Sequence, residues 1–163
     1  MDFSNITVLC VGDVMLDRFV YGEMERISPE APVPVLLLKE RKEMPGGAGN
    51  VASNIISLGG QAILIGLVGE DEAAVILRDA LRLRTGVSEM LVTSPKRPTI
   101  CKTRFIASHQ QVVRADEESR QKLQPEEAEL LCRAIDARLE EADVVILSDY
   151  GKGVCDSMVV RHL

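Results

Sequence analysis

Three short stretches of this sequence combine glycine with carboxylate or amide side chains, which are groups that bind oxygen-rich ligands. They are Gly12-Asp13-Val14-Met15-Leu16-Asp17, Gly46-Gly47-Ala48-Gly49-Asn50 and Ser148-Asp149-Tyr150-Gly151-Lys152-Gly153. Carboxylates accept hydrogen bonds from hydroxyl groups, amides both donate and accept, and glycine lets a ligand approach the backbone. Each stretch alone also fits a turn, a cap or a salt-bridged surface loop. Their chemistry therefore depends on whether the fold gathers them.

A local group of basic residues is a fourth candidate. Lys96, Arg97, Lys102 and Arg104 lie close together in the sequence without an acidic neighbour, and Arg114 follows. Lys102 and Arg104 are two positions apart, so on a strand they share one face. Arginine binds phosphate in a bidentate manner and lysine binds it as a point charge. A phosphate site is one interpretation, and solvated charges that protect a sheet edge from aggregation are the other.

The elements that must position these residues follow an alternating order. Apolar runs at 6–12, 62–68 and 144–147 are typical of strands buried on both faces of a parallel sheet. Apolar stripes of helical period predict helices at about 51–58, 71–83 and 125–139, and a further helix from Val154. This alternation predicts an α/β fold with a largely parallel sheet. Ligands of such sheets bind at the carboxyl ends of the strands, where Asp13 and Asp149 fall.

Two segments, about 18–43 and 96–116, do not fit the alternation. The first contains Pro29, Pro32 and Pro34, which exclude a helix and favour extended chain, so we expect an excursion of short strands. In the second, residues 99–115 form a hairpin-like pattern with a polar tip at 108–111. We expect the two excursions to pair with each other as a small second sheet, forming a lid over the main one.

The composition excludes several classes of protein. The chain has 163 residues, 25 acidic and 19 basic, and a formal net charge of −6. Hydrophobic residues make up 46%, so disorder is excluded as the main state. The net acidity argues against binding nucleic acid through bulk charge, and no apolar run is long enough to cross a bilayer. Because Asp2 and no basic segment precedes the run at 6–12, a signal peptide is a poor fit. We expect a cytoplasmic protein without nucleic-acid or membrane partners.

Two further kinds of site receive little support. The four cysteines, at positions 10, 101, 132 and 155, are too widely spaced for a zinc site, and we predict no metal ligands. Residues 47–52 match the dinucleotide pattern GxGxxA, and Glu70 lies about 20 residues further on. That pattern must directly follow a buried strand, whereas 39–45 suit an exposed connection. A dinucleotide enzyme is therefore a minor alternative, to be tested by titration with NAD.

Taken together, the motifs are more specific than any one of them. The order GD-VML-D (12–17), RISPEAPVPV (26–35), PGGAGNVASNIISLGG (45–60) and LSDYGKG (147–153) resembles the N-terminal half of the heptose 7-phosphate kinases, a branch of the ribokinase-like (PfkB) sugar kinases. The resemblance covers essentially the whole chain, from about residue 6 to residue 163. It implies an α/β sandwich with a small β lid that is often used for homodimerisation. It also implies transfer of the γ-phosphate of ATP to the anomeric hydroxyl of D-glycero-β-D-manno-heptose 7-phosphate, for ADP-heptose and lipopolysaccharide core synthesis.

The resemblance also implies which residues contact the substrate. Asp17 matches the aspartate that holds sugar hydroxyls, and Gly46, Gly47 and Asn50 match the sugar-binding GG-x-x-N motif. Beside these and Asp13, the candidates for the remaining sugar and 7-phosphate contacts are Lys102, Arg104, Gln110, Arg114 and Asp149.

One departure from the family bears on the mechanism. The family carries a later GAGD motif that supplies the anion hole and the general base, and no GAGD occurs in these 163 residues. We therefore predict no catalytic residue here, an incomplete fold and no useful kinase activity of this chain alone. ATP and Mg²⁺ are expected for the complete enzyme, and no residue identified here binds them. The alternatives are a non-catalytic sugar-phosphate-binding or dimerisation module, or another PfkB-family sugar kinase.

Overall fold

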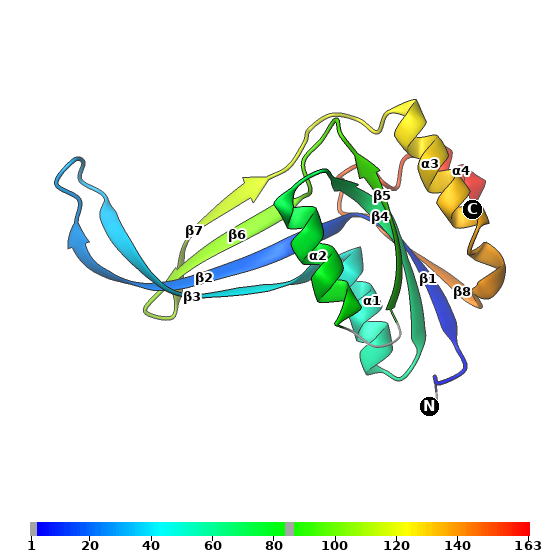
Figure 1. The fold of residues 1–163 in the computed structure, drawn as a ribbon, viewed down its shortest axis with the longest axis horizontal. Coiled ribbons are helices and arrows are strands. Elements are labelled where there is room, and N and C mark those ends of the chain that lie inside the picture. The colour runs from blue at the N-terminus through cyan, green and yellow to red at the C-terminus, as the bar shows by residue number, and fades with distance from the viewer. Residues whose placement is uncertain (1–2, 84–86) are drawn as a thin grey trace.

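The computed structural model describes residues 3–83 and 87–163, and it consists of an α/β body with a long arm of strands (Figure 1). The strands of the body are β1 (Thr7–Gly12), β4 (Gln61–Gly69), β5 (Val87–Ser94) and β8 (Val144–Ser148). Its helices are α1 (Ala48–Ser57), α2 (Glu72–Arg82), α3 (Pro125–Asp136), the short 3-10 helix η1 (Leu139–Glu141) and α4 (Ser157–His162). The arm contains β2 (Val14–Ile27), β3 (Pro34–Gly47), β6 (Cys101–Ala107) and β7 (Gln110–Glu117), which we call the lid sheet.

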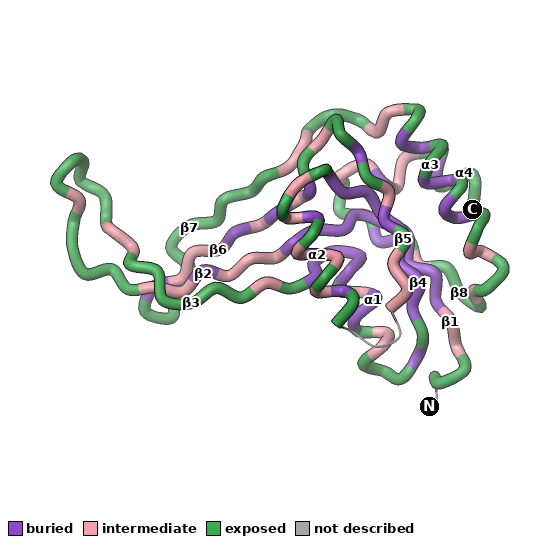
Figure 2. Tube along the Cα trace, viewed as in Figure 1, coloured by how far each residue is buried: buried purple, intermediate pink, exposed green. Residues whose placement is uncertain are grey.

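The body confirms the predicted α/β class. Its sheet has the order β5-β4-β1-β8, and every pair of neighbours is parallel. One core packs this sheet against α1 and α2, and a second core packs it against α3 and α4. The central strand β1 is apolar after Thr7, as expected for a strand covered on both faces, and Leu9, Cys10 and Val11 are fully buried. Figure 2 shows this buried centre. The carboxyl ends of the four strands therefore lie along one edge.

The lid sheet joins the two excursions, as the sequence predicts. Its order is β3-β2-β6-β7, with β2 and β6 parallel and the outer pairs antiparallel. The first excursion differs from the predicted short strands, because β2 and β3 are each 14 residues long. Pairing along their whole length, with two register shifts, satisfies the backbone groups that the two strands turn toward each other. The exposed connection expected at 39–45 is thus part of β3, an antiparallel lid strand, so residues 47–52 lack the βαβ context of a dinucleotide site.

Several boundaries and one strand differ from the predictions. Strand β5 was not predicted, because the sequence VSEMLVTS mixes polar and apolar residues without a clear period. Helix α3 ends at Asp136, so Leu139 lies in η1, and the last helix begins at Ser157 instead of Val154. Strand β8 was expected to be buried, yet Val144 and Leu147 are exposed. It lies at the edge of the body sheet, where β1 is its one paired neighbour among the described residues.

Within the described residues, none of the helices is long and apolar enough to span a membrane.

Candidate functional site

Asp13 is the single residue between β1 and β2, and it connects three parts of the chain. Its backbone N–H donates to the carbonyl of Ser148, and its own carbonyl accepts from the N–H of Ala48 at the start of α1. Its carboxylate accepts three backbone N–H groups of the loop after β8: Tyr150 at 2.8 Å, Lys152 at 3.0 Å and Val154 at 3.0 Å. The whole residue is buried. The predicted contact between Asp13 and substrate is therefore corrected: Asp13 shapes the loop that surrounds the site.

Asp17 lies on β2 beside the glycines at the end of β3. A Cβ atom at position 46 would collide with Oδ2 of Asp17 and press on the side chain of Met15, so only glycine leaves this carboxylate in place. Gly47 has a φ of 56°, in the left-handed region that glycine adopts without strain, and a Cβ there would strike the carbonyl oxygen of Asp13. Both glycines are buried, and they bring the backbone of β3 close to β2.

Asn50 and Asp149 lie on either side of this region and are exposed. Asn50 is in the first turn of α1, whose start has no side-chain cap. Asp149 directly follows β8, and its Oδ1 accepts the N–H of Gly151 at 2.8 Å. Hydrogen bonds with Asp13 fix the chain near both residues. Ala48, two residues before Asn50, is bonded to Asp13, and so are Ser148 and Tyr150 on either side of Asp149. Asp17, Asn50 and Asp149 thus belong to one edge of the body sheet and the base of the lid sheet.

The predicted cations share one face of the lid sheet. Lys102 is paired with Asp17 across β2 and β6, and Arg104 is paired with Arg114 across β6 and β7. Because paired residues and residues two apart point to the same side, these four side chains lie on one face. The guanidinium of Arg104 donates to Oδ1 of Asp17 and lies 5.1 Å from the ring centre of Phe19.

Gln110 lies apart from this group. It begins β7 opposite Ala107, at the outer end of the β6–β7 hairpin. The pair Arg104 and Arg114 lies three residues closer to the body, which is about 10 Å along a strand. The structure therefore does not bring Gln110 together with Asp17 and Lys102.

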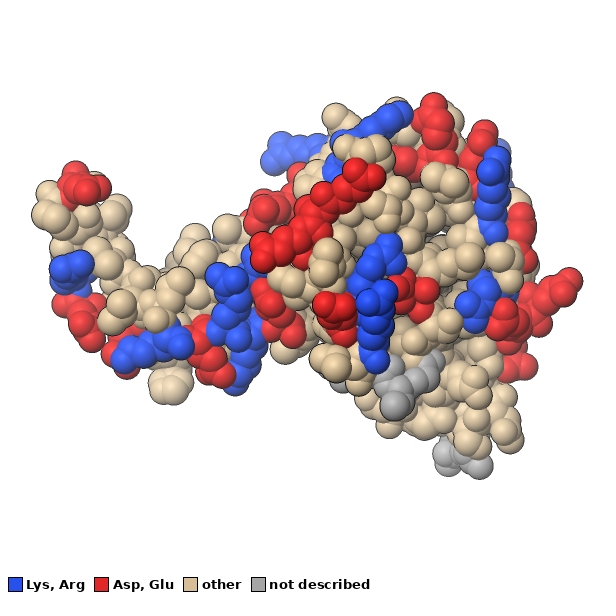
Figure 3. All heavy atoms as spheres, in the orientation of Figure 1, with Lys and Arg blue, Asp and Glu red and all other residues tan. Residues whose placement is uncertain are grey.

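The basic residues are not a free positive patch, although the sequence suggested one. Lys102 lies 3.2 Å from Asp116, Arg114 lies 2.8 Å from the same carboxylate, and Arg97 lies 2.9 Å from Glu127. Lys96 pairs with Glu126 at 3.4 Å. Figure 3 shows blue and red side chains interspersed along the arm. Lys96, Arg97, Lys102 and Arg104 lack acidic neighbours in the sequence but have them in the structure. Their partners come from other segments, earlier for Arg104 and later for the rest.

Two functional candidates, Glu118 and Lys152, were not among the predicted site residues. Oε1 of Glu118, just after β7, accepts from Nζ of Lys152 at 2.8 Å, and its Oε2 lies 3.8 Å from Nζ of Lys102. The hydrogen bond from Lys152 lowers the pKa of the Glu118 carboxyl, and this outweighs the opposing effect of burial. The one signal in the sequence was the acidic run at 116–118, which is equally typical of a solvated strand end.

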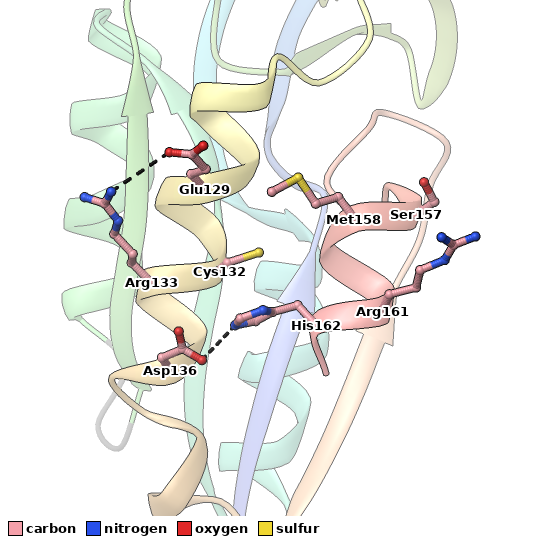
Figure 4. A pocket seen from close by; sticks show the side chains of 8 residues that line it. All are labelled: Glu129, Cys132, Arg133, Asp136, Ser157, Met158, Arg161 and His162. Carbon is pink, nitrogen blue, oxygen red and sulfur yellow. Dashed lines mark hydrogen bonds and ion pairs between the residues drawn. The ribbon is translucent and has the colours of Figure 1, made fainter.

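A separate groove of about 610 Å³ lies between α3 and α4 (Figure 4). Nε2 of His162 lies 2.7 Å from Oδ1 of Asp136 across it, and Cys132 and Met158 line it between them. None of the predicted site residues lines this groove. It opens between helices on the surface of the body and not at the carboxyl ends of the strands, so it is not the site built around Asp13.

A metal centre is not among the features of this site. In residues 3–83 and 87–163, no group of three His, Cys, Asp or Glu side chains is arranged to hold a metal ion. The arrangement offers instead carboxylate and amide groups for hydroxyls beside cations for an anionic group. It suits a hydroxylated, negatively charged small molecule.

Comparison with known proteins gives the family. The profile of the pfkB family carbohydrate kinases matches residues 5–161. The chain belongs to the pfkB family of carbohydrate kinases. It is 67% identical over 162 residues to a protein named "Bifunctional protein HldE" from Gluconacetobacter diazotrophicus, and 57% identical over 163 residues to one of the same name from Granulibacter bethesdensis. These alignments cover 99% and 100% of this chain but 34% of each relative, so the chain spans about a third of their length.

Solved structures share the fold. A putative phosphofructokinase from Staphylococcus aureus has a TM-score of 0.72 at 13% identity, covering 96% of this chain and 49% of that one. Phosphofructokinase-2 from Escherichia coli in complex with fructose-6-phosphate has a TM-score of 0.61 at 23% identity, covering 91% of this chain and 45% of that one. The predicted ribokinase-like architecture is thereby confirmed, with this chain corresponding to part of it.

Proposed function

We propose that this chain is the sugar-binding part of a cytoplasmic kinase that phosphorylates D-glycero-β-D-manno-heptose 7-phosphate at its anomeric hydroxyl, for ADP-heptose and lipopolysaccharide core synthesis. The proposal is supported by the family, by relatives named HldE and by the heptose-branch motifs RISPEAPVPV and LSDYGKG. The observation that carries it is the position of Asp17, between Gly46 and the cations Lys102 and Arg104. A sugar hydroxyl and a phosphate can be bound side by side there.

The roles follow from the chemistry of each group. Asp17 and Asp149 accept hydrogen bonds from sugar hydroxyls, and Asn50 both accepts and donates. Gly46 and Gly47 leave the space that the side chains of Asp17 and Met15 and the carbonyl of Asp13 occupy, and so keep Asp17 in position for the sugar. Lys102, Arg104 and Arg114 bind the 7-phosphate. Each arginine can donate two parallel hydrogen bonds to it, and the lysine acts as a point charge. Gln110 remains a candidate for a substrate contact, which would require the lid sheet to change shape because Gln110 lies at the outer end of the β6–β7 hairpin.

The contribution of these residues to the reaction is positioning. Phosphoryl transfer depends chiefly on alignment of the acceptor and on stabilising charge on the moving group. ATP and Mg²⁺ would supply the phosphoryl group and neutralise its charge in the complete enzyme. No base or anion hole of the GAGD type is present in the 163 residues, so we propose that the chain alone holds the sugar and does not turn it over.

The test compares this chain with the full-length chain, meaning the sequence extended to the length of its relatives. We expect the full-length chain to transfer phosphate from ATP to heptose 7-phosphate, and the 163-residue chain to show no turnover. Asp17→Asn in the full-length chain should lower kcat/KM by roughly 10- to 100-fold, the range expected for a lost hydrogen bond to a charged group. The exposed Lys122→Gln is the matched control and should stay within about twofold of the wild type.

Two results would overturn the proposal. One is a full-length chain that leaves heptose 7-phosphate unchanged, and the other is wild-type turnover by Asp17→Asn. A parallel assay with fructose 6-phosphate distinguishes another PfkB-family sugar kinase, which would prefer that substrate.

A second function is supported by the opposite face of the lid sheet, where a groove of about 490 Å³ is lined almost entirely by apolar side chains. Its lining residues are Met24, Pro34, Leu36, Leu38, Phe105, Val112 and Val113. Leu38 and Val113 are more than half exposed. Exposed apolar patches of this kind mark surfaces that associate. We propose that two copies of the chain dimerise through this groove of the lid sheet, with or without catalysis.

A further inference from the structure

Two lysines from distant parts of the chain converge on one carboxylate at the base of the lid sheet. Lys102 comes from β6, Lys152 from the loop after β8, and Glu118 from the segment after β7. Nζ of Lys152 lies 2.8 Å from Oε1 of Glu118, and Nζ of Lys102 lies 3.8 Å from Oε2. The side chains are largely covered, with 24% of Lys152, 15% of Lys102 and 21% of Glu118 exposed. Such convergence of cations resembles an anion site occupied by an internal carboxylate.

The carboxylate does not satisfy this position fully. Oε2 of Glu118 is screened from solvent and has no hydrogen-bond partner among the described residues. A buried oxygen without a partner carries a desolvation cost of about 1–3 kcal/mol. A phosphate group has more acceptor oxygens than a carboxylate and spreads them in three dimensions, so it can accept from both ammonium groups at once.

We infer that Lys152 is a further phosphate-binding residue of the sugar site, and that Glu118 holds its ammonium in place until the phosphate of the sugar replaces the carboxylate. This inference rests on the proposed function and deepens it, since it names where the anionic end of the substrate is bound. Lys152 is a substrate-binding residue in this arrangement, and Glu118 occupies its ammonium group in competition with the phosphate.

The available space and the balance of charge both favour replacement of the Glu118 carboxylate by phosphate over binding of phosphate beside it. The cavity beside Lys152, bounded by Asp13, Arg97 and Ser119, has about 10 Å³ of free volume, which is the scale of a single water molecule and too small for phosphate. This cavity therefore cannot hold the phosphate, which reaches Lys152 by taking the place of the carboxylate. Lys102, Lys152 and Arg114 now face the two carboxylates Glu118 and Asp116. After exchange, three cations face one carboxylate and a phosphate of about two negative charges, so the charges balance.

Two substitutions separate phosphate binding from a purely structural ion pair. If Lys152 only ties the loop to the lid sheet, Lys152→Gln and Glu118→Gln break the same pair and have the same effect. If Lys152 binds phosphate, Lys152→Gln removes a ligand while Glu118→Gln removes a competitor. The two variants then change phosphate affinity in opposite directions.

The experiment uses the full-length chain and calorimetric titration with heptose 7-phosphate and with inorganic phosphate, neither of which requires turnover. We expect the Kd for both to rise about tenfold or more in Lys152→Gln and to stay equal or fall in Glu118→Gln, relative to wild type and to the Lys122→Gln control. Lys152→Arg should restore most of the affinity.

Three results would overturn the inference: equal losses in both variants, an unchanged Kd in Lys152→Gln, or a wild type that binds neither ligand. Melting temperatures of all variants report whether each is folded. Failure of the proposed function appears separately, as a wild-type chain without transfer to the sugar. Transfer by the wild type with equal losses in the two variants overturns only the role of Lys152.

Discussion

At the scale of single residues, the most constrained group of the site is a carboxylate whose partners are all backbone N–H groups. Asp13 is fully buried, and its two carboxylate oxygens accept three backbone N–H groups from the loop at 150–154. The position of Asp13 directly after a buried strand is equally typical of a ligand and of a loop anchor. Only the burial and the three donors decide between them.

Asp13→Asn tests this role. The amide keeps the size of the side chain but replaces one acceptor oxygen with a donor, which then faces a backbone N–H. We expect a loss of about 1–3 kcal/mol in the free energy of unfolding and a lower melting temperature of the full-length chain. Asp149→Asn, at an exposed position, is the control and should change stability by less than about 0.5 kcal/mol. Equal melting temperatures for the two variants would contradict the anchoring role.

The sequence predicts those site residues that depend on local geometry. Lys102 and Arg104 share a face because successive side chains of a strand point to opposite sides. Gly46 and Gly47 are placed before a helix because an apolar stripe of helical period follows them at about 51–58. The contact between Glu118 and Lys152 cannot be predicted in this way, since 34 residues separate them and their contact depends on how the lid sheet is placed over the body. Glu127, the acidic partner of Arg97, could not be predicted for a similar reason, since it lies on another element. Asp116 is a local partner, because it lies two residues from Arg114 and opposite Lys102 in the β6–β7 hairpin.

At the scale of elements, the junction between β5 and α3 is fixed by a buried carboxylate. Glu127 accepts from the N–H of Gln124 at 2.9 Å, from the hydroxyl of Ser94 at 2.5 Å and from Arg97 at 2.9 Å. Burial alone would raise the pKa of Glu127, but these donors outweigh it and hold the pKa below its ordinary value near 4.5. A group with a lowered folded pKa stabilises the protein above its unfolded pKa and ceases to do so as the pH falls.

Glu127→Gln should therefore have two effects on thermal unfolding. At pH 7 it leaves Arg97 buried without a charge partner, at a cost of roughly 3–5 kcal/mol. Between pH 5 and pH 3, in the region of the carboxyl pKa, the variant should lose less further stability than the wild type does. Glu129→Gln, an exposed change on the same helix, is the control. Parallel acid curves for wild type and Glu127→Gln would show that this carboxyl does not contribute.

The elements themselves were predictable to the extent that each is specified locally. Buried runs predict β1 and β4, Asp71 predicts the start of α2, which it caps, and Pro125 predicts the start of α3, where it lies in the first turn. Strand β5 was missed because its pairing with β4 and not its own pattern makes it a strand. Strand β8 was predicted but not its exposure, which depends on the order of strands in the sheet.

At the scale of the whole molecule, the apolar groove of the lid sheet predicts self-association. Leu38→Asp or Val113→Asp would place a charge in the surface that two copies bury. We expect each to raise the Kd of the dimer of the full-length chain by about tenfold or more, measured by sedimentation. Leu58→Asp, at an exposed apolar position outside the lid sheet, should leave the dimer intact. A wild-type monomer at high concentration, or variants that remain dimeric, would contradict this surface.

The joints between the arm and the body have a mechanical consequence. Asp13 alone separates β1 from β2, and β3 passes into α1 without an intervening residue. At these two joints β2 and β3 have no slack segment on which to swing, whereas β6 and β7 join the body through residues 95–100 and 118–124. Movement of the β2–β3 side of the arm therefore requires its strands to flex. Any such flexing must pull on the glycine turn at the helix start and on the carboxylate that shapes the neighbouring loop. Under the proposed function, binding of the sugar and the shape of the arm therefore change together.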